Sequence, residues 1–522
     1  MKKIFLLILI SVLSLNLMAQ KHEIGITIKN LPNQEVILGH HFNEKLIPDD
    51  TAKLDSKGVG VFKGKKELTG GMYFVFLPNR NYFDILIDND NQKFSIENDT
   101  TDFLEKMVIT GSLENQLFVD YQKFLNASKE EYEKISADLT KYKEKNNTAK
   151  IEECQAKLDV INKNVENKYQ EQISKYPNMF FSKFLTATRD ITIPENITDQ
   201  NERYFYYKAH YFDNFDLSDG RLLRTALYEP KIERYIENIV VQMPDSLIKE
   251  TTMMVNKART SEELFRYVLV YFFNKYAKSE SMMAENVYCS LAEIYVKDAV
   301  WDTDSFKTAL KKKITKKENC LVGNKSKPML MQLLPNDTTR IDALRPFTEV
   351  LKTEGVEIEK KKPDFEARRN DVVKILDNLV NKFDGYVEMH DSKSKYTLIT
   401  FWEPDCSHCK EEIPKLFKYY QDTLKNYGVT VWAVYMNKSV DNLGDLHRHI
   451  NKWFDFVKEH KLFEKGWINC WNPFDQYRDN YDVNSTPTLY LLDEKKEILA
   501  KRLSHTQVYE LINMIEEAEN KK

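Results

Sequence analysis

The chain has 522 residues, a formal net charge of −4 at pH 7 and a hydrophobic fraction of 42%. This near-neutral balance, without long basic runs, excludes a protein that binds nucleic acid mainly by charge. The 28 tyrosines and 29 phenylalanines exclude a disordered chain. At about 150 residues per domain, the length predicts roughly three domains.

The N-terminus has the pattern of a secretory signal peptide. Lys2 and Lys3 precede an apolar run over residues 4–17, and the small residue Ala19 follows. These features predict a signal peptide over residues 1–19. The run is shorter than the roughly 20 apolar residues of a membrane-spanning helix. We therefore expect an exported mature chain without a transmembrane helix, located in the periplasm or cell envelope.

Residues 20–112 have the pattern of short β-strands. Apolar residues alternate with polar ones, as in Ile24, Ile26 and Ile28, and turn sequences such as Gly70-Gly71 separate the alternating segments. Short strands at this spacing predict an all-β, sandwich-like domain. This domain shows no cluster of catalytic residue types.

Residues 113–318 change to helical spacing. Leu158, Ile161 and Val165 fall on one helical face, and the polar break Asn146-Asn147-Thr148 separates two long charged segments. A helical hairpin within the chain is the simpler interpretation, and a coiled-coil oligomer is the alternative. The region shows no metal-ligand spacing, phosphate loop or nucleophile signature. We expect a mainly helical accessory region.

Residues 319–522 contain a strand, a turn, a Cys-x-x-Cys sequence and a helix in that order. The apolar run 396–402 predicts a strand buried on both faces, and Cys406 and Cys409 follow it at the start of a helical pattern. Backbone N–H groups at a helix start favour a thiolate, which is the nucleophilic form of cysteine. We expect Cys406 to be the attacking sulfur and Cys409 to resolve the mixed disulfide, with His408 favouring the thiolate.

The sequence also bears on the other four cysteines and on two alternative uses of the Cys406–Cys409 pair. Isolated cysteines are expected to be buried, small apolar side chains; these are Cys154, Cys289, Cys320 and Cys470. A zinc site using Cys406, Cys409 and His408 lacks the second ligand pair that structural zinc needs, so no metal is expected. A permanent structural disulfide would close only a small ring and gain little stability.

The segment Phe401–Cys409 resembles the active-site region of thioredoxin-like proteins. It is most similar to the envelope branch of bacterial thiol–disulfide interchange and cytochrome-maturation proteins. The segment Tyr481–Asp493 resembles the part of that family that carries a cis-proline, here Pro487. The resemblance covers roughly residues 320–522, and the preceding regions resemble the accessory domains of some envelope proteins. It implies an α/β thioredoxin-like domain over residues 319–522.

The resemblance also implies roles for individual residues. Thr486 and Pro487, together with Trp402, are expected to form the substrate-binding surface, and Glu412 is the expected proton relay. Two positions depart from the family: Thr400 stands where cytoplasmic thioredoxins have a buried aspartate, and Asp405 stands where tryptophan is usual. A negative charge at Asp405 disfavours a thiolate at the next residue. A helical insertion is expected near residues 341–383.

The resulting hypothesis is an exported thiol–disulfide oxidoreductase, and the family resemblance alone favours a reductase of envelope protein disulfides over an oxidase or an isomerase. Its substrates are protein thiols and disulfides. The Cys406–Cys409 pair carries two electrons, so no bound cofactor is expected, whereas a membrane-bound redox partner is expected to regenerate the pair. The alternative is a secreted binding or scaffold protein whose thioredoxin-like domain is redox-inactive, because more than half of the chain has no catalytic signal.

Overall fold

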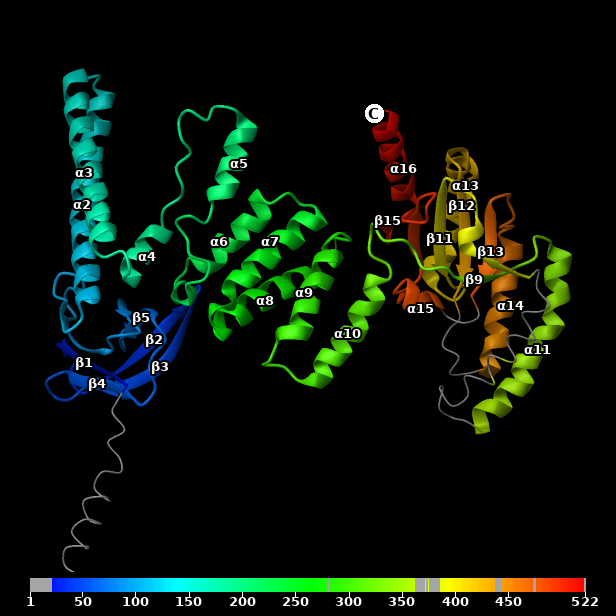
Figure 1. The fold of residues 1–522 in the computed structure, drawn as a ribbon, viewed down its shortest axis with the longest axis horizontal. Coiled ribbons are helices and arrows are strands. Elements are labelled where there is room, and N and C mark those ends of the chain that lie inside the picture. The colour runs from blue at the N-terminus through cyan, green and yellow to red at the C-terminus, as the bar shows by residue number, and fades with distance from the viewer. Residues whose placement is uncertain are drawn as a thin grey trace, which may run out of the picture. The chain divides into compact units, whose positions relative to one another are not determined.

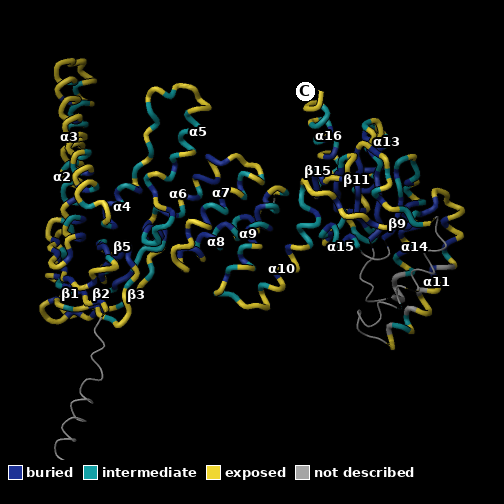
Figure 2. Tube along the Cα trace, in the orientation of Figure 1, coloured by how far each residue is buried: buried dark blue, intermediate teal, exposed yellow. Residues whose placement is uncertain are grey.

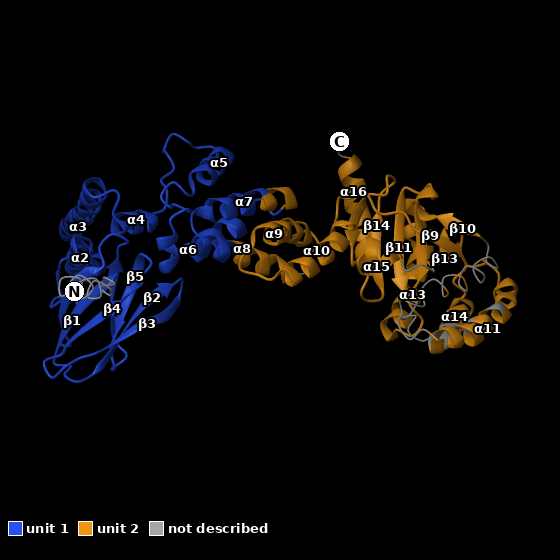
Figure 3. Ribbon diagram, turned by 60° about the horizontal axis from the view of Figure 1, so that its bottom comes forward, with its two compact units in different colours: residues 1–242, 249–268 blue, residues 243–248, 269–522 orange. Residues whose placement is uncertain are grey.

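A computed structural model describes residues 21–279, 281–361, 371, 374, 385–436, 443–472 and 476–520. The predicted signal peptide lies outside the described residues. The chain divides into two compact units, Met1–Gln242 with Lys249–Val268 and Met243–Ile248 with Leu269–Lys522 (Figure 3). The domain limits predicted from the sequence stay predictions.

The first unit begins with two β-sheets. Its strands are β1 (His22–Lys29), β2 (Glu35–Phe42), β3 (Lys45–Lys53), β4 (Val59–Gly64), β5 (Gly71–Phe76), β6 (Tyr82–Ile87), β7 (Lys93–Asp99) and β8 (Val108–Thr110). Within the described residues 21–112 they form two four-stranded sheets, in the orders β4-β1-β7-β8 and β3-β2-β5-β6 (Figure 1). Alternating apolar residues such as Ile24, Ile26 and Ile28 are buried in a core that both sheets share. The sandwich-like fold is confirmed.

A helical hairpin follows in the same unit. α2 (Leu113–Glu144) and α3 (Thr148–Lys175) lie side by side, and the side chains of Ser112 and Asn147 cap their first turns. Leu158 and Ile161 are buried, whereas most charged residues of the hairpin are exposed (Figure 2). The hairpin within one chain is confirmed.

Helices make up the rest of the middle region. They are α4 (Phe180–Ala187), α5 (Gln200–His210), η1 (Gly220–Arg224), α6 (Tyr228–Arg234), η2 (Tyr235–Ile239), α7 (Pro244–Lys257), η3 (Ala258–Thr260), α8 (Glu262–Ala277), α9 (Ala284–Asp298) and α10 (Asp304–Glu318). The division between the units falls within α7 and α8, so α9 and α10 belong to the second unit. The mainly helical middle region is confirmed.

The described part of the C-terminal region contains a seven-stranded sheet in the order β10-β9-β13-β12-β11-β14-β15. Its strands are β9 (Leu330–Leu333), β10 (Tyr386–Glu388), β11 (Tyr396–Trp402), β12 (Val429–Tyr435), β13 (Trp467–Trp471), β14 (Thr488–Leu492) and β15 (Ile498–Lys501). β11, β12 and β13 are parallel, and the outer strands are antiparallel to their neighbours. Every residue of β11 is buried, which confirms the prediction from its continuous apolar run.

Helices cover the sheet. They are α11 (Thr338–Lys361), η4 (Met389–Asp391), α13 (Ser407–Asp422), η5 (Leu424–Tyr427), α14 (Leu443–Glu459), α15 (Gln476–Asn480) and α16 (His505–Asn520). Residues from α11, α13, α14 and α16 share one core with one face of the sheet. α11 covers the first part of the expected insertion, and most of residues 362–383 lie outside the described residues, so the insertion stays a prediction. No helix within the described residues is both long and apolar enough to span a membrane.

Candidate active site

Cys406 lies at the junction of β11 and α13. Because it is the N-cap residue of α13, its backbone is extended, with φ −74° and ψ 121°. The backbone N–H of Cys409 donates a hydrogen bond to Cys406 Sγ at 3.3 Å. Unpaired N–H groups at a helix start stabilise negative charge. The fold therefore places this sulfur where a thiolate is favoured.

The Thr486–Pro487 segment forms the other side of the Cys406 environment. The peptide bond between these residues is cis, and the Cys406 thiol lies 3.3 Å from the carbonyl oxygen of Thr486. Partial burial alone would raise the pKa of Cys406. Hydrogen bonds from Cys409, from the Thr486 side chain and from the His408 backbone outweigh burial and lower the pKa below its ordinary value.

Cys409 is in the opposite environment. Its side chain is 0% exposed and packs in the core beneath α13. Burial is the main cause that raises the pKa of the Cys409 thiol to about 12. Both cysteines are present as free thiols. One partly exposed, acidic thiol thus precedes one buried thiol that stays protonated at neutral pH.

His408 and Glu412 line a cavity of about 310 Å³ beside α13, which Pro487 also lines. Glu412 Oε2 lies 2.8 Å from His505 Nδ1, and Oε1 accepts a hydrogen bond from Lys415 at 3.0 Å. Partial burial would raise the pKa of Glu412, but Lys415 and His505 lower the pKa below its usual value. Glu412 is therefore a charged, ion-paired carboxylate on the same helix as Cys409.

Trp402 lies apart from this group. It is the last residue of β11, its side chain is 0% exposed, and its ring packs against Phe456 with centroids 5.0 Å apart. A side chain buried in this way does not reach a docked polypeptide. The structure brings together Cys406, Cys409 and Thr486-Pro487, and it does not support a substrate contact by Trp402.

The sequence reasoning missed the two partners of Asp405. His449 Nδ1 lies 2.6 Å from Asp405 Oδ2, and Lys452 Nζ donates to Oδ1 at 2.7 Å. Partial burial would raise the pKa of Asp405, but Lys452 and His449 lower the pKa below its usual value. His449 and Lys452 lie three residues apart on α14 and so share a helical face. The spacing of His449 and Lys452 is visible in the sequence. The sequence does not show that this helical face packs against Asp405.

The metal hypothesis has no matching site in the described part of the chain. There, no group of three or more histidine, cysteine, aspartate or glutamate side chains is arranged to hold an ion.

Three known families match parts of the chain. The AhpC/TSA family matches residues 358–501, which include the cysteine pair and the cis-proline segment. The C-terminal domain has a thioredoxin-like fold. Two domains of unknown function precede it: DUF4369 matches residues 22–118, and DUF5106 matches residues 153–319. No curated protein matches the chain.

Solved structures resemble the chain over different lengths. A thioredoxin-like protein from Bacteroides caccae has 18% identity, over 62% of this chain and 98% of that chain, with a TM-score of 0.39. The thioredoxin domain of a thiol-disulfide oxidoreductase from Bacteroides vulgatus has 28% identity, over 26% of this chain and 85% of that chain, with a TM-score of 0.20. StoA from Bacillus subtilis has 23% identity, over 24% and 88% respectively, with a TM-score of 0.20.

Proposed function

We propose that this protein is an exported thiol–disulfide oxidoreductase that reduces disulfides of envelope proteins. The main support is the contrast within one helical turn between the two thiols. Cys406 is partly exposed at the start of α13 with a lowered pKa. Cys409 is fully buried, with a pKa raised to about 12. Only the first can attack an external disulfide as a thiolate at neutral pH.

The exchange proceeds in two steps. The Cys406 thiolate attacks one sulfur of a substrate disulfide, a mixed disulfide forms, and the other substrate sulfur leaves as a thiolate. Cys409 then loses its proton and attacks Cys406 Sγ. A Cys406–Cys409 disulfide forms, and the second substrate sulfur leaves with the electron pair. Two electrons pass from the cysteine pair to the substrate, so no bound cofactor is needed.

Neighbouring residues serve these steps. The Cys409 proton must pass to an acceptor, and the ionised Glu412, which lies on α13 three residues after Cys409, is our candidate relay. His408 favours the Cys406 thiolate. The backbone of Thr486, held beside Cys406 by the Pro487 segment, pairs with the substrate strand. A membrane-bound redox partner returns two electrons to the oxidised pair.

Export rests on the signal-peptide pattern of residues 1–19. N-terminal sequencing of the protein purified from a cell-envelope fraction should give Gln20 as the first residue. A protein that retains Met1 and fractionates with the cytoplasm would refute export.

The reduction potential of the Cys406–Cys409 pair tests the function. Equilibration in redox buffers followed by thiol trapping measures it, and the Cys406→Ser variant is the control. A value near the about −270 mV of thioredoxin supports a reductase, whereas a value near the about −120 mV of a strong disulfide donor contradicts it. If the pair does not cycle at all, a secreted binding or scaffold protein replaces the oxidoreductase.

A further inference from the structure

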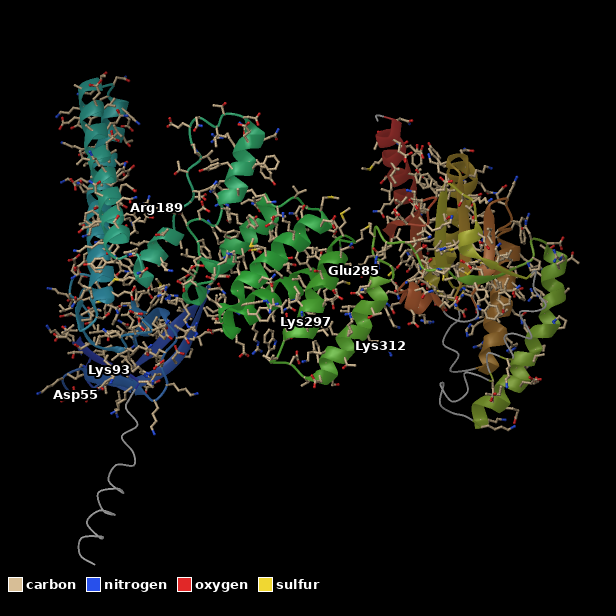
Figure 4. All side chains as sticks on the ribbon, viewed as in Figure 1. Asp55, Lys93, Arg189, Glu285, Lys297 and Lys312 are labelled. Atoms are coloured by element: carbon tan, nitrogen blue, oxygen red, sulfur yellow. The ribbon has the colours of Figure 1, made fainter. Side chains whose placement is uncertain are left out.

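A buried ionic network connects helices α9 and α10 to the end of the sheet in the second unit. The Lys501 side chain on β15 is 1% exposed, forms an ion pair with Glu285 of α9, and donates a hydrogen bond to the Cys320 carbonyl at 2.9 Å. Lys317 of α10 contacts Glu285 at 2.5 Å and Asp482 at 3.0 Å. Figure 4 labels Glu285 at the start of α9.

This network has more cations than carboxylates. Lys501, Lys317 and Arg502 surround the two carboxylates of Glu285 and Asp482. Burial would raise the pKa of Glu285, but the two lysines lower the pKa below its usual value, so this carboxylate is charged at neutral pH. Both lysines make short contacts. The unmatched positive charge therefore resides on Arg502.

Arg502 has no short ion pair within the network. Its guanidinium lies 3.7 Å from Glu285 and 3.9 Å from Asp482, which is too far for a hydrogen bond, and its side chain is 56% exposed. Its backbone is fixed, since its N–H donates to the Leu489 carbonyl at 2.7 Å. Its φ of 58° lies in the left-handed region, which is uncommon for a residue with a side chain.

Arg502 also lines two cavities. The first, of about 310 Å³, contains His408, Glu412 and Pro487 of the candidate active site. The second, of about 180 Å³, is lined on the other side by Tyr276, Tyr288, Lys313 and Lys317. The charge of Glu412 in the first cavity is offset by His505 and Lys415. The charge of Glu285 in the second is offset by Lys317 and Lys501.

We propose that Arg502 receives an aspartate or glutamate side chain of the polypeptide that carries the substrate disulfide. The substrate disulfide then lies at Cys406, and the chain continues through the first cavity, past Arg502 and along α9 and α10. This inference deepens the proposed function and rests on it. It makes the helical region preceding the sheet part of the substrate site, and it names the preferred substrate: a disulfide flanked by acidic residues.

Two peptides test the proposal. They carry the same disulfide and differ only in flanking residues, glutamate in one and glutamine in the other. We expect the KM of the full mature protein for the glutamate peptide to be about fivefold lower than its KM for the glutamine peptide, which is the effect of one partly exposed ion pair. Added salt should remove the difference. The Arg502→Gln variant should lose this preference through KM, while its kcat and its reaction with the small neutral hydroxyethyl disulfide stay unchanged.

Matched variants make the test specific. Lys312→Gln removes a positive charge from an exposed side chain of α10 that lines a different cavity (Figure 4), and it should keep the preference. Lys313→Gln, at the second cavity, should reduce the preference in part. Arg502→Lys should restore part of it. Equal KM values for the two peptides, or a preference that survives in Arg502→Gln, would overturn the inference.

A binding measurement separates this inference from the proposed function. If the wild-type protein reduces hydroxyethyl disulfide but does not discriminate between the peptides, only the inference fails. If it reduces no disulfide, the function fails. Fluorescence anisotropy of the same labelled peptides with Cys406→Ser protein then decides the docking site: tighter binding of the glutamate peptide supports it, and equal binding refutes it.

Discussion

His449 Nδ1 lies 2.6 Å from Oδ2 of Asp405, the residue that immediately precedes Cys406. Lys452 holds the other oxygen of the same carboxylate at 2.7 Å. A carboxylate beside a thiol opposes the thiolate by like-charge repulsion. Helix α14 therefore supplies positive charge that offsets Asp405, and the reactivity of Cys406 depends on residues more than forty positions away in the sequence.

Changing these charges should shift the reactivity of Cys406 in opposite directions. Lys452→Met leaves Asp405 less compensated, so we expect a higher pKa for Cys406 and slower alkylation by iodoacetamide at pH 7. Asp405→Asn should lower the pKa and speed alkylation. In the Asp405→Asn background, the Lys452→Met change should have a smaller effect, because the two residues act on one another.

Lys458→Met is the control for this series. Lys458 lies on the same helix but pairs with Asp342 of α11, so its removal should leave the alkylation profile unchanged. A Lys452→Met profile that coincides with that of the control would show that α14 does not tune the thiol.

Alkylation of the native reduced protein should modify one cysteine of six. Cys406 is partly exposed and the other five are buried. Because the pKa of Cys406 is lowered and that of Cys409 is raised to about 12, the thiolate of Cys406 forms first as pH rises. We expect the alkylation rate of Cys406 to reach half its maximum at a pH below the pKa of a free cysteine, which is about 8.5. Peptide mass mapping locates the label, and a label on Cys409 below pH 8 would contradict this order.

Thr400→Val should stabilise the second unit. Thr400 is 0% exposed, and its hydroxyl has no hydrogen-bond partner among the described residues. Replacing a buried, unpaired hydroxyl by a methyl group should raise the free energy of unfolding by about 1 kcal/mol. All six tryptophans lie in this unit, so tryptophan fluorescence during urea unfolding follows it alone. A loss of stability on substitution would show that a water molecule satisfies the hydroxyl.

Lys501→Met should destabilise the same unit. Removing one partner of a buried ion pair leaves the other charge without compensation, and we expect a cost of about 3 kcal/mol. The double variant with Glu285→Gln should lose less than the sum of the single changes. Lys316→Met is the matched control, because its ion pair with Asp479 is largely exposed and should contribute at most about 1 kcal/mol. Equal effects of Lys501→Met and its control would refute the importance of burial.

Local patterns in the sequence predicted the parts of the site that depend on neighbouring residues. The apolar run of β11, the cysteine pair at a helix start and the alternating strands of the sandwich each follow from short-range spacing. The compensation of Asp405 could not be predicted, because it needs the packing of α14 against the loop before α13. For that reason, the expectation from the sequence was that Asp405 is a negative charge without compensation.

Burial was harder to predict for single residues than for whole strands. Trp402 belongs to the same motif as the cysteines, yet it turns into the core at the end of β11. Lys501 follows an ordinary strand pattern, and its distant partners Glu285 and the Cys320 carbonyl explain a lysine there. Strand β9 was not predicted either, because a strand of four residues is too short for its sequence pattern to separate it from a helix.

The position of β9 limits how far the thioredoxin-like module could be moved between proteins. Residues 358–501 match the family, but Leu330–Leu333 lies before that match and pairs with both β13 and β10. A fragment that begins at the family boundary would expose the backbone edge of β13, which is a template for aggregation. It would also leave Lys501 without the carboxylate of Glu285. A fragment that keeps these contacts has to begin before α9. Domain shuffling that transfers this module to another protein would therefore transfer part of the helical region as well.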